Sequence, residues 1–305
     1  QLQLEPYPHQ SAALLAWKQS GRQGVVVLPT GAGKTLVAQL AMAATPRSTL
    51  IVVPTIDLMH QWYAQLLTAF PGTEIGLLGG GSRDRTPILI ATYDSAAIQI
   101  ESLGDLYGLL IFDECHHLPT DFYRVVAEYS IAPYRLGLSA TPERSDGKHE
   151  DLGILIGKEV HRQTAADLAG SALAPYRVEQ IKVKLSPEEL NRYHELIQKI
   201  SLGSIDGWQK FVRASWRSTE GRRAMLAHRE AKEITLSTNG KLRILAEILA
   251  RHYPESTLIF TSDNATVYRI AQTLLIPAIT HHTPVKERHE ILTHFRDGTY
   301  KTLVA

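Results

Sequence analysis

The sequence predicts an α/β protein in which a parallel sheet carries helices on both faces. A helical block and the opening part of a second α/β unit follow it. Three observations support this prediction. Short β-branched runs alternate with helical stretches from residue 24 to about residue 140, no strand pattern interrupts residues 186–235, and the alternation resumes after residue 240. Continuous apolar strands separated by helices are typical of parallel sheets buried on both sides.

Five apolar runs in the first unit have the composition of buried strands. Because the strands of such a sheet run the same way, the loops that follow them meet at one edge, where ligands bind. The expected strands are 25–28, 50–53, 88–91, 109–112 and 136–138. The expected helices are 33–44, 56–69 and 120–129.

The rest of the chain divides into a connector, a helical block and a resumed α/β pattern. Residues 141–185 are irregular, although residues 176–184 alternate like a strand. Ser186 followed by Pro187 and two glutamates is a good helix start. The resumed pattern predicts helices 241–252, 264–275 and 285–296, strands 257–261 and 300–304, and a short apolar stretch at 276–279. The expected regions are 1–175, 176–236 and 237–305.

The composition fits an intracellular globular protein. Of its 305 residues 44% are hydrophobic and one is cysteine, so an intramolecular disulfide framework is excluded. No apolar run approaches the roughly 18 residues of a membrane span, and no signal peptide is recognisable. We expect no membrane partner, and a location in the cytoplasm of a prokaryote or the nucleus of a eukaryote. The net charge of +1 means that contacts with nucleic acid must come from local patches.

Both ends of the chain have the pattern of internal sequence. The chain begins with Gln1 rather than Met, and residues 301–305 have the pattern of a buried strand. Natural termini are seldom apolar strands. We therefore interpret the chain as a fragment.

A glycine-rich run between a predicted strand and a predicted helix indicates a phosphate-binding loop. Its glycines let backbone N–H groups approach phosphate oxygens, Lys34 brings positive charge, and the Thr35 hydroxyl is a magnesium ligand. Leu28 stands where the strict pattern has glycine, and a glycine-rich turn that merely opens a helix is the alternative. The nucleotide-binding residues expected here are Thr30, Gly31, Ala32, Gly33, Lys34 and Thr35.

An acidic pair follows the apolar run 109–112. Asp113 is expected to hold magnesium, and Glu114 to orient or deprotonate the attacking water. Together with Lys34 these two residues form the predicted catalytic set. An acidic pair that is merely solvated at a strand end is the alternative.

Cys115 and the histidines after it raise the question of a metal site. A second Cys/His cluster at ligand spacing is missing from the sequence, so a zinc site is the weaker interpretation. Cys115 is expected to pack in the core. His116 is expected to contact the terminal phosphate or to link the acidic pair to a neighbouring strand.

These motifs resemble those of superfamily 2 helicases. Asp113-Glu114-Cys115-His116 and Leu138-Ser139-Ala140-Thr141-Pro142 look like the second and third motifs of that superfamily. The resemblance implies a RecA-like motor domain in which Ser139, Ala140 and Thr141 couple nucleotide hydrolysis to movement.

Three further segments resemble motifs of the same superfamily. Val52-Val53-Pro54-Thr55 with Leu58-Met59-His60-Gln61-Trp62 looks like the Ia segment, and Ala91-Thr92-Tyr93 like a later threonine segment. The resemblance implies that Thr55 and Thr92 contact DNA. Tyr7-Pro8-His9-Gln10 resembles the upstream glutamine motif, which implies that Gln10 reads adenine, although the family often has Arg where Tyr7 stands.

Within the superfamily, the chain resembles the XPB type on the stretches 131–150, 258–264 and 275–281. XPB-type enzymes are double-stranded DNA translocases and 3′–5′ helicases used in nucleotide excision repair and promoter opening. The resemblance implies ATP with Mg²⁺ as cofactor and double-stranded or forked DNA as partner, and it suggests a nuclease partner protein. It also implies a helical thumb, whose place residues 186–235 match, and a second RecA-like domain of which the chain holds the first part.

The resemblance also shows two departures from the family pattern. Arg144-Ser145-Asp146 stands where the family carries Arg-Glu-Asp, so Arg144 and Asp146 are expected to contact DNA while the unwinding role of the element is in doubt. The fifth and sixth motifs of the family, whose arginines reach the ATP site, would follow residue 305. Such arginines are worth about 10³–10⁵ in rate in related enzymes. We therefore expect the chain to bind ATP but to hydrolyse it poorly.

A basic segment with interleaved aromatic residues lies at 208–232, where seven basic and two acidic residues leave a local charge of +5. Basic side chains suit phosphates, and planar rings can stack on bases. The alternative is an amphipathic helix pair with core aromatics and solvated charges. The DNA-binding residues expected here are Arg213, Trp216, Arg217, Arg222 and Arg223.

Other functions are compatible with the motifs, and each can be distinguished from a DNA translocase by a specific feature. The motor subunit of a restriction enzyme would need a nuclease motif, which the sequence lacks, and an RNA helicase would prefer RNA. A non-catalytic scaffold that binds DNA or a partner leaves the intact Lys34 and Asp113 unexplained. A P-loop kinase leaves Ser139-Ala140-Thr141 and the second α/β unit without a role.

Overall fold

The computed structural model describes residues 5–201 and 218–305. Contacts divide the chain into one unit over Gln1–Val178 and another over Glu179–Ala305. The predicted boundaries at 175 and 236 stay a proposal, because compactness alone does not define the three regions.

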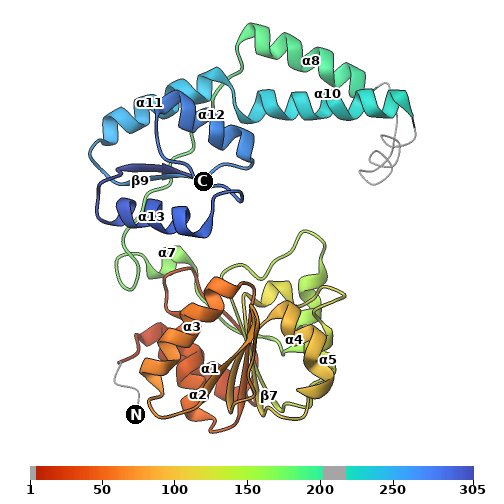
Figure 1. Cartoon of the computed structure of the whole chain (residues 1–305), viewed down its shortest axis with the longest axis vertical. Coiled ribbons are helices and arrows are strands. Elements are labelled where there is room, and N and C mark those ends of the chain that lie inside the picture. The colour runs from red at the N-terminus through yellow and green to blue at the C-terminus, as the bar shows by residue number, and fades with distance from the viewer. Residues whose placement is uncertain (1–4, 202–217) are drawn as a thin grey trace. The chain divides into compact units, whose positions relative to one another are not determined.

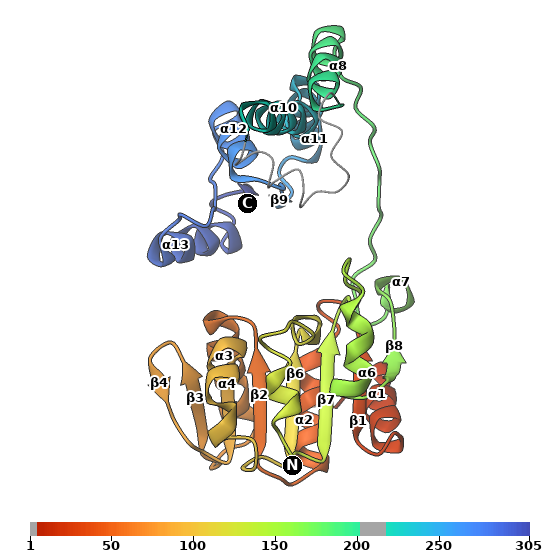
Figure 2. The same cartoon turned by 90° about the vertical axis from the view of Figure 1, so that its right-hand side faces the viewer.

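An eight-stranded sheet forms the centre of the first unit, with the strand order β4-β3-β5-β2-β6-β7-β1-β8 (Figure 2). Neighbouring strands are parallel except for the antiparallel pair β3 and β4. The strands are β1 (Gln23–Val27), β2 (Thr49–Val53), β3 (Ile75–Gly79), β4 (Ser82–Arg83), β5 (Ile88–Thr92), β6 (Leu109–Asp113), β7 (Tyr134–Ser139) and β8 (Glu159–Arg162).

Helices cover both faces of this sheet (Figure 1). One face carries α1 (Pro8–Gln19), α2 (Lys34–Ala44) and α3 (Ile56–Ala69), and the other carries α4 (Tyr93–Gln99), α5 (Val125–Glu128) and α6 (Leu152–Leu155). A last short helix, α7 (Ala165–Leu168), follows β8. Three single turns of 3₁₀ helix complete the unit: η1 (Ile100–Ser102), η2 (Cys115–His117) and η3 (Lys148–Asp151).

The central strands are buried along their whole length because both faces are covered. In β6, Leu110 and Phe112 belong to the core under α4–α6, whereas Leu109 and Ile111 belong to the core under α1–α3. Each fully buried side chain of this kind contributes about 1.5–3 kcal/mol. The alternation explains why these runs are apolar at every position, and the predicted parallel α/β fold is confirmed.

Several elements differ from the expectations. The expected helix 120–129 is only α5, since residues 120–124 form turns in which the Thr120 hydroxyl accepts a bond from the Tyr123 N–H at 3.3 Å. The sequence patterns did not predict α1, α4, β3, β4 or β8. Tyr7 is not a favoured residue for starting a helix. The edge strand β8 is only partly buried, so its apolar pattern is weak.

The second unit begins with two packed helices, α8 (Pro187–Ser201) and α10 (Thr219–Leu236). Leu196 of α8 packs with Ala227 and Ala231 of α10. The unit continues with α11 (Asn239–His252), β9 (Thr257–Ile259), α12 (Asn264–Leu274), α13 (Val285–Arg296) and β10 (Thr302–Val304).

A short parallel sheet of β9 and β10 forms the centre of the second unit. Ala278, in the predicted apolar stretch, adds a single parallel bridge to Val304. The expected strand at 176–184 does not form. That segment is almost entirely exposed and has no strand or helix, so alternation alone did not make it a strand.

Gly104 provides a stability test of the first core. A Cβ atom there would lie 2.2 Å from the Tyr129 carbonyl oxygen, which is backbone and cannot swing away. We expect Gly104→Ala to destabilise the first unit by about 1–3 kcal/mol, the usual cost of overpacking. Urea unfolding followed by circular dichroism measures this loss.

Gly153 provides the matched control. It lies in helix α6, and an added Cβ would meet no atom within 4 Å. Gly153→Ala should leave stability unchanged or raise it by about 0.4–1 kcal/mol. Equal effects of the two changes would contradict the packing assigned to Gly104.

Candidate nucleotide-binding site

Three motifs meet at the carboxyl edge of the first sheet. The strands that precede them, β6, β7 and β1, are consecutive in the sheet order. Val27 pairs with Ser139, and Asp113 pairs with Leu138. In addition, the backbone N–H of Leu28 donates to the carbonyl of Ser139 at 3.1 Å. The glycine-rich loop, the acidic pair and the Ser-Ala-Thr segment therefore leave the sheet side by side.

The glycine-rich loop has the backbone conformation that its glycines allow. Gly31 and Gly33 have φ values of 84° and 78°, in the left-handed region that disfavours other residues. Gly33 lies at the start of α2, and a Cβ atom on it would lie 2.2 Å from the Gln10 amide nitrogen. The loop thus leads directly into the amino end of α2, where orphan N–H groups and the helix dipole favour anions.

Helix α1 supports this loop from the side. Ala32 offers its carbonyl oxygen to His9 Nε2 at 2.8 Å and to Gln10 Nε2 at 3.0 Å. The other end of the Gln10 amide, Oε1, accepts a bond from the Tyr7 N–H at 2.9 Å. Both polar ends of Gln10 therefore have partners within the chain, and a contact of Gln10 with adenine stays a prediction. His9 was missed as a supporting residue, although it stands within the Tyr-Pro-His-Gln motif.

The predicted catalytic residues converge although they are far apart in the sequence. Lys34 Nζ lies 4.0 Å from Glu114 Oε1 and donates to the Leu28 carbonyl at 3.2 Å. Glu114 has a φ of 47°, a left-handed conformation that a non-glycine residue rarely adopts. Such backbone strain persists only where the surrounding structure imposes it, and it gathers at functional sites.

Asp113 is a buried carboxylate whose two oxygens both have donors. Its Oδ2 accepts from the Trp62 indole N–H at 2.8 Å, and its Oδ1 accepts from the Glu114 N–H at 3.0 Å. Burial raises the pKa of the Asp113 carboxyl, and the hydrogen bond from Trp62 opposes that rise. Sequence patterns did not assign Trp62 to this site.

His116 connects the acidic pair to strand β7. Its Nδ1 lies 3.1 Å from Ser139 Oγ and 3.4 Å from Glu114 Oε2. Ser139 Oγ lies 3.5 Å from Glu114 Oε2 and accepts from the Thr141 N–H at 3.2 Å. Of the two roles expected for His116, the link to a neighbouring strand is the one for which these contacts are present.

Arg144 and Asp146 bind each other. Arg144 Nε and Nη2 donate to the two oxygens of Asp146 at 3.0 and 2.7 Å, and Nη1 donates to the His116 carbonyl at 2.7 Å. The guanidinium lowers the pKa of the Asp146 carboxyl to about 2. These side chains therefore already have partners within the first unit, and their predicted contacts with DNA stay a prediction.

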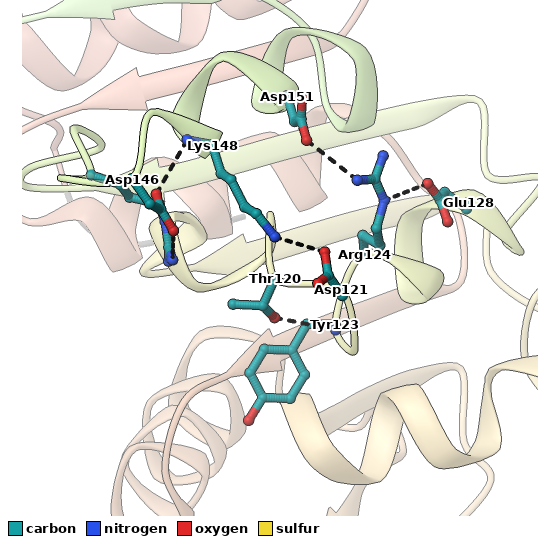
Figure 3. Close-up of polar contacts among 9 residues, drawn as sticks. Thr120, Asp121, Tyr123, Arg124, Glu128, Asp146, Lys148 and Asp151 are labelled. Atoms are coloured by element: carbon teal, nitrogen blue, oxygen red, sulfur yellow. Dashed lines mark hydrogen bonds and ion pairs between the residues drawn. The ribbon is translucent and has the colours of Figure 1, made fainter. Parts of the chain in front are cut away.

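Further ion pairs tie the segment after β7 to the segment after β6 (Figure 3). Lys148 Nζ donates to Asp121 Oδ1 at 2.7 Å, and Arg124 Nη1 donates to Asp151 Oδ2 at 3.3 Å. Arg124 Nε also donates to Glu128 Oε1 at 2.7 Å within the segment after β6. Solvent screens exposed pairs of this kind, so each adds little to stability. The Lys148–Asp121 and Arg124–Asp151 pairs connect the segments that follow the neighbouring strands β6 and β7.

The other predicted DNA contacts are located as follows. Thr55 is exposed and caps α3 by accepting the Leu58 N–H, whereas Thr92 is buried and caps α4 by accepting the Ser95 N–H. Arg222 and Arg223 are exposed on α10. Arg213, Trp216 and Arg217 lie outside the described residues.

Two oxygen-bearing side chains predicted for this site are of the type that binds a magnesium ion. The Thr35 hydroxyl and the Asp113 carboxylate are hard donors, and Mg²⁺ typically uses one or two such ligands together with phosphates and water. Over residues 5–201 and 218–305, no group of three or more His, Cys, Asp or Glu residues is placed to hold a metal.

Cys115 is fully buried, and burial raises the pKa of its thiol, as expected for a packed core residue. Within the same described ranges, no helix is long and apolar enough to cross a membrane.

A glycine-rich loop, an acidic pair and a Ser-Ala-Thr segment follow three neighbouring strands of a parallel sheet. This arrangement is typical of the class of P-loop motor proteins. The family model described as "Type III restriction enzyme, res subunit" matches residues 3–144. The DNA 3′-5′ translocase XPB2 of Sulfurisphaera tokodaii is 42% identical over 99% of this chain and 70% of its own length. The chain belongs to the family of XPB-type DNA 3′–5′ translocases and helicases.

Other relatives give the extent of the similarity. The DNA 3′-5′ helicase XPB of Kineococcus radiotolerans is 31% identical over 97% of this chain, which spans 50% of that relative. The corresponding protein of Mycobacterium tuberculosis is 30% identical over 93% of this chain and 48% of its own length. The crystal structure of the Pyrococcus furiosus Hef helicase domain has the same fold, with a TM-score of 0.59 and 18% identity over 98% of this chain and 85% of that one.

Cys115 offers a direct test of the packing beneath the acidic pair. Because the thiolate is the reactive species and burial disfavours it, we expect no alkylation by iodoacetamide in native buffer. One thiol per chain should react in concentrated urea. Rapid labelling of the folded chain, measured by mass spectrometry, would contradict the placement of Cys115 in the core.

Proposed function

We propose that this chain is the motor part of an ATP-dependent translocase that moves 3′–5′ on double-stranded or forked DNA. The observation that supports this most is the convergence of Lys34, Glu114 and Ser139 at one sheet edge, through contacts of 3.5 to 4.0 Å with Glu114. The 3′–5′ direction of movement and the choice of DNA are proposed from the membership of the XPB-type family. The chain spans about half of two of these relatives, so the activity of a whole protein is part of the proposal.

In this proposal the chain's own residues divide the work on ATP. Backbone N–H groups of the loop, at Gly31 and Gly33, bind phosphate oxygens, and Lys34 stabilises the charge of the outer phosphates. The Ala32 N–H donates to the Pro29 carbonyl at 3.2 Å and would have to leave it to bind phosphate. Thr35 and Asp113 hold a magnesium ion, which neutralises charge on the phosphates when bound. Glu114, whose carboxylate lies 4.0 Å from Lys34 Nζ, orients the water that attacks the terminal phosphate.

Coupling to DNA would run through the segments that surround Glu114. His116 and Ser139 both lie within 3.5 Å of the Glu114 carboxylate. A movement of this carboxylate would therefore alter its contacts with Ser139 at the end of β7. Ala140 and Thr141 continue from Ser139 into the segment that carries Arg144. Thr55, at the start of α3, and Arg222 and Arg223, on α10, are the exposed candidates for DNA contacts.

The restriction-enzyme motor is the second candidate, because a family model of that name matches residues 3–144. The XPB-type relative matches 99% of the chain, which favours the translocase. A preference for RNA over duplex DNA in stimulating ATP hydrolysis would favour an RNA helicase instead. A nuclease partner protein, suggested by the family resemblance, stays a prediction.

Lys34→Ala tests the nucleotide site. Removing the ammonium group leaves developing phosphate charge without its partner, so we expect MgATP affinity or turnover to fall by about 10²-fold or more. Calorimetric titration with MgATP and a phosphate-release assay measure the two quantities. Lys18→Ala, which removes an exposed lysine from α1, is the control and should behave like the unchanged chain. Full MgATP binding by Lys34→Ala would argue against the proposed site.

Changing Arg222 and Arg223 to Ala tests the DNA surface. If both contact phosphates, DNA affinity should fall and the slope of log K against log salt should decrease by up to about 2. The control is the double change of Arg243 and Arg251 to Ala, which removes the same charge from exposed positions on α11. Fluorescence anisotropy with a labelled duplex at several salt concentrations distinguishes them. The same slope for both double variants would make Arg222 and Arg223 ordinary surface residues.

A further inference from the structure

Trp62, the last residue of the segment that resembles motif Ia, makes a buried polar contact that the motif did not predict. Its side chain lies on α3 with 2% of its surface exposed, yet its indole N–H donates to Asp113 Oδ2 at 2.8 Å. An indole N–H can only donate, so its natural partner is an acceptor such as an ionised carboxylate. This bond joins the helix after β2 to the end of β6, and those two strands are paired neighbours.

The bond determines which way the Asp113 carboxylate points. One oxygen, Oδ1, is held by the N–H of the next residue, Glu114, and the other is held by Trp62. Among the described residues, Trp62 makes the one side-chain hydrogen bond to Asp113. Burial disfavours a charged carboxylate, and a donor at this distance offsets that cost. Without the indole N–H, Oδ2 would be a buried acceptor free to rotate away.

The position of Trp62 on α3 gives the bond a second consequence. Thr55 caps α3 and is a predicted DNA contact, and Trp62 lies two turns further along the same helix. Tyr93 follows Thr92, the other predicted contact, and its hydroxyl donates to the Asp113 carbonyl at 3.1 Å. Two elements expected to meet DNA therefore each bond to Asp113 from a buried aromatic residue.

We propose that Trp62 is a positioning residue that orients the Asp113 carboxylate toward the magnesium ion of bound nucleotide and makes that orientation depend on α3. The proposal rests on the function proposed above. The partners that orient a metal ligand typically contribute 10–100-fold to metal affinity. A tryptophan that only filled the core could donate its indole N–H to any acceptor nearby, as Trp17 does to the Arg135 carbonyl, whereas the acceptor of Trp62 is the predicted magnesium ligand itself.

The test compares Trp62→Phe with Trp17→Phe in the same 305-residue chain. Trp17 is the matched control because it too is fully buried in the first unit and donates its indole N–H, at 2.9 Å, to the Arg135 carbonyl rather than to Asp113. Both changes delete one indole hydrogen bond of a buried tryptophan. Only Trp62→Phe removes a bond to the predicted magnesium ligand.

The measured quantity is the affinity for ADP, by calorimetry, with Mg²⁺ and with EDTA. The ratio of the two affinities isolates the part that depends on magnesium. We expect Trp62→Phe to reduce this ratio about 10–100-fold while ADP affinity in EDTA is unchanged. Trp17→Phe should leave the ratio as it is. Thermal unfolding shows whether the two variants lose similar stability.

A second measurement does not depend on the folding of Trp62→Phe. Of the four tryptophans, changing Trp17, Trp208 and Trp216 to Phe leaves the Trp62 indole as the single indole N–H signal in an ¹⁵N spectrum. That signal should shift when Mg²⁺ is added to the ADP complex, and it should shift again with duplex DNA. An unchanged chemical shift of this signal on addition of Mg²⁺ would overturn the proposal.

The other outcomes separate the two levels of inference. In one outcome, Mg²⁺ raises the ADP affinity of the unchanged chain, and Trp62→Phe keeps that gain within about twofold. This loss is smaller than an orienting partner would cause. Trp62 is then a packing residue, and its proposed role fails while the proposed nucleotide site stands. Equal losses in Trp62→Phe and Trp17→Phe lead to the same conclusion. If the unchanged chain binds ADP without any effect of Mg²⁺, the proposed nucleotide site itself fails, and the role of Trp62 fails with it.

Discussion

The parallel pairing of β6, β7 and β1 is the constraint on which the rest of this site depends. The pairs Val27 with Ser139 and Asp113 with Leu138 bring the ends of the three strands to the same level. Since side chains alternate between the faces of a strand, a slip of one residue would turn a whole strand's core residues toward the opposite face. The burial of β6 on both sides thus fixes where Asp113 and Glu114 emerge.

A buried acid at the edge of an apolar sheet needs compensation, and the surroundings of Asp113 supply it. The carboxylate has a donor on each oxygen, and the Tyr93 hydroxyl donates to the backbone carbonyl of the same residue. Glu114 takes the strain, with a left-handed backbone that a packed neighbourhood must hold in place. The large cores on both faces of the sheet provide the rigidity that keeps such a conformation.

Polar links outside the sheet extend the site toward the rest of the first unit. His116 reaches β7 through Ser139, and Arg144 returns from the segment after β7 to the carbonyl of His116. The second unit uses a different principle. Alanines on one face of α10 allow α8 to pack closely, and this leaves the arginines of α10 to solvent.

Composition and local patterns determined the positions of the strands β1, β2, β5, β6 and β7, the glycine-rich loop and the acidic pair. These features depend on residues within a few positions of one another, so apolar runs and a Gly-Lys-Thr segment suffice to find them. Short or half-exposed elements such as α1, β4 and β8 carry little apolar periodicity, and they were missed for that reason. The strand predicted at 176–184 failed because alternation favours a strand only where a partner is available.

Only the tertiary structure decided which side chains complete the site. Trp62 and Asp113 are 51 positions apart, and His9 and Ala32 are 23 apart. No local pattern specifies such pairs, because they depend on strand order and on which helix covers which face. The residues that bear charge were therefore visible in the sequence, whereas those that hold them in place became visible only when the sheet was assembled.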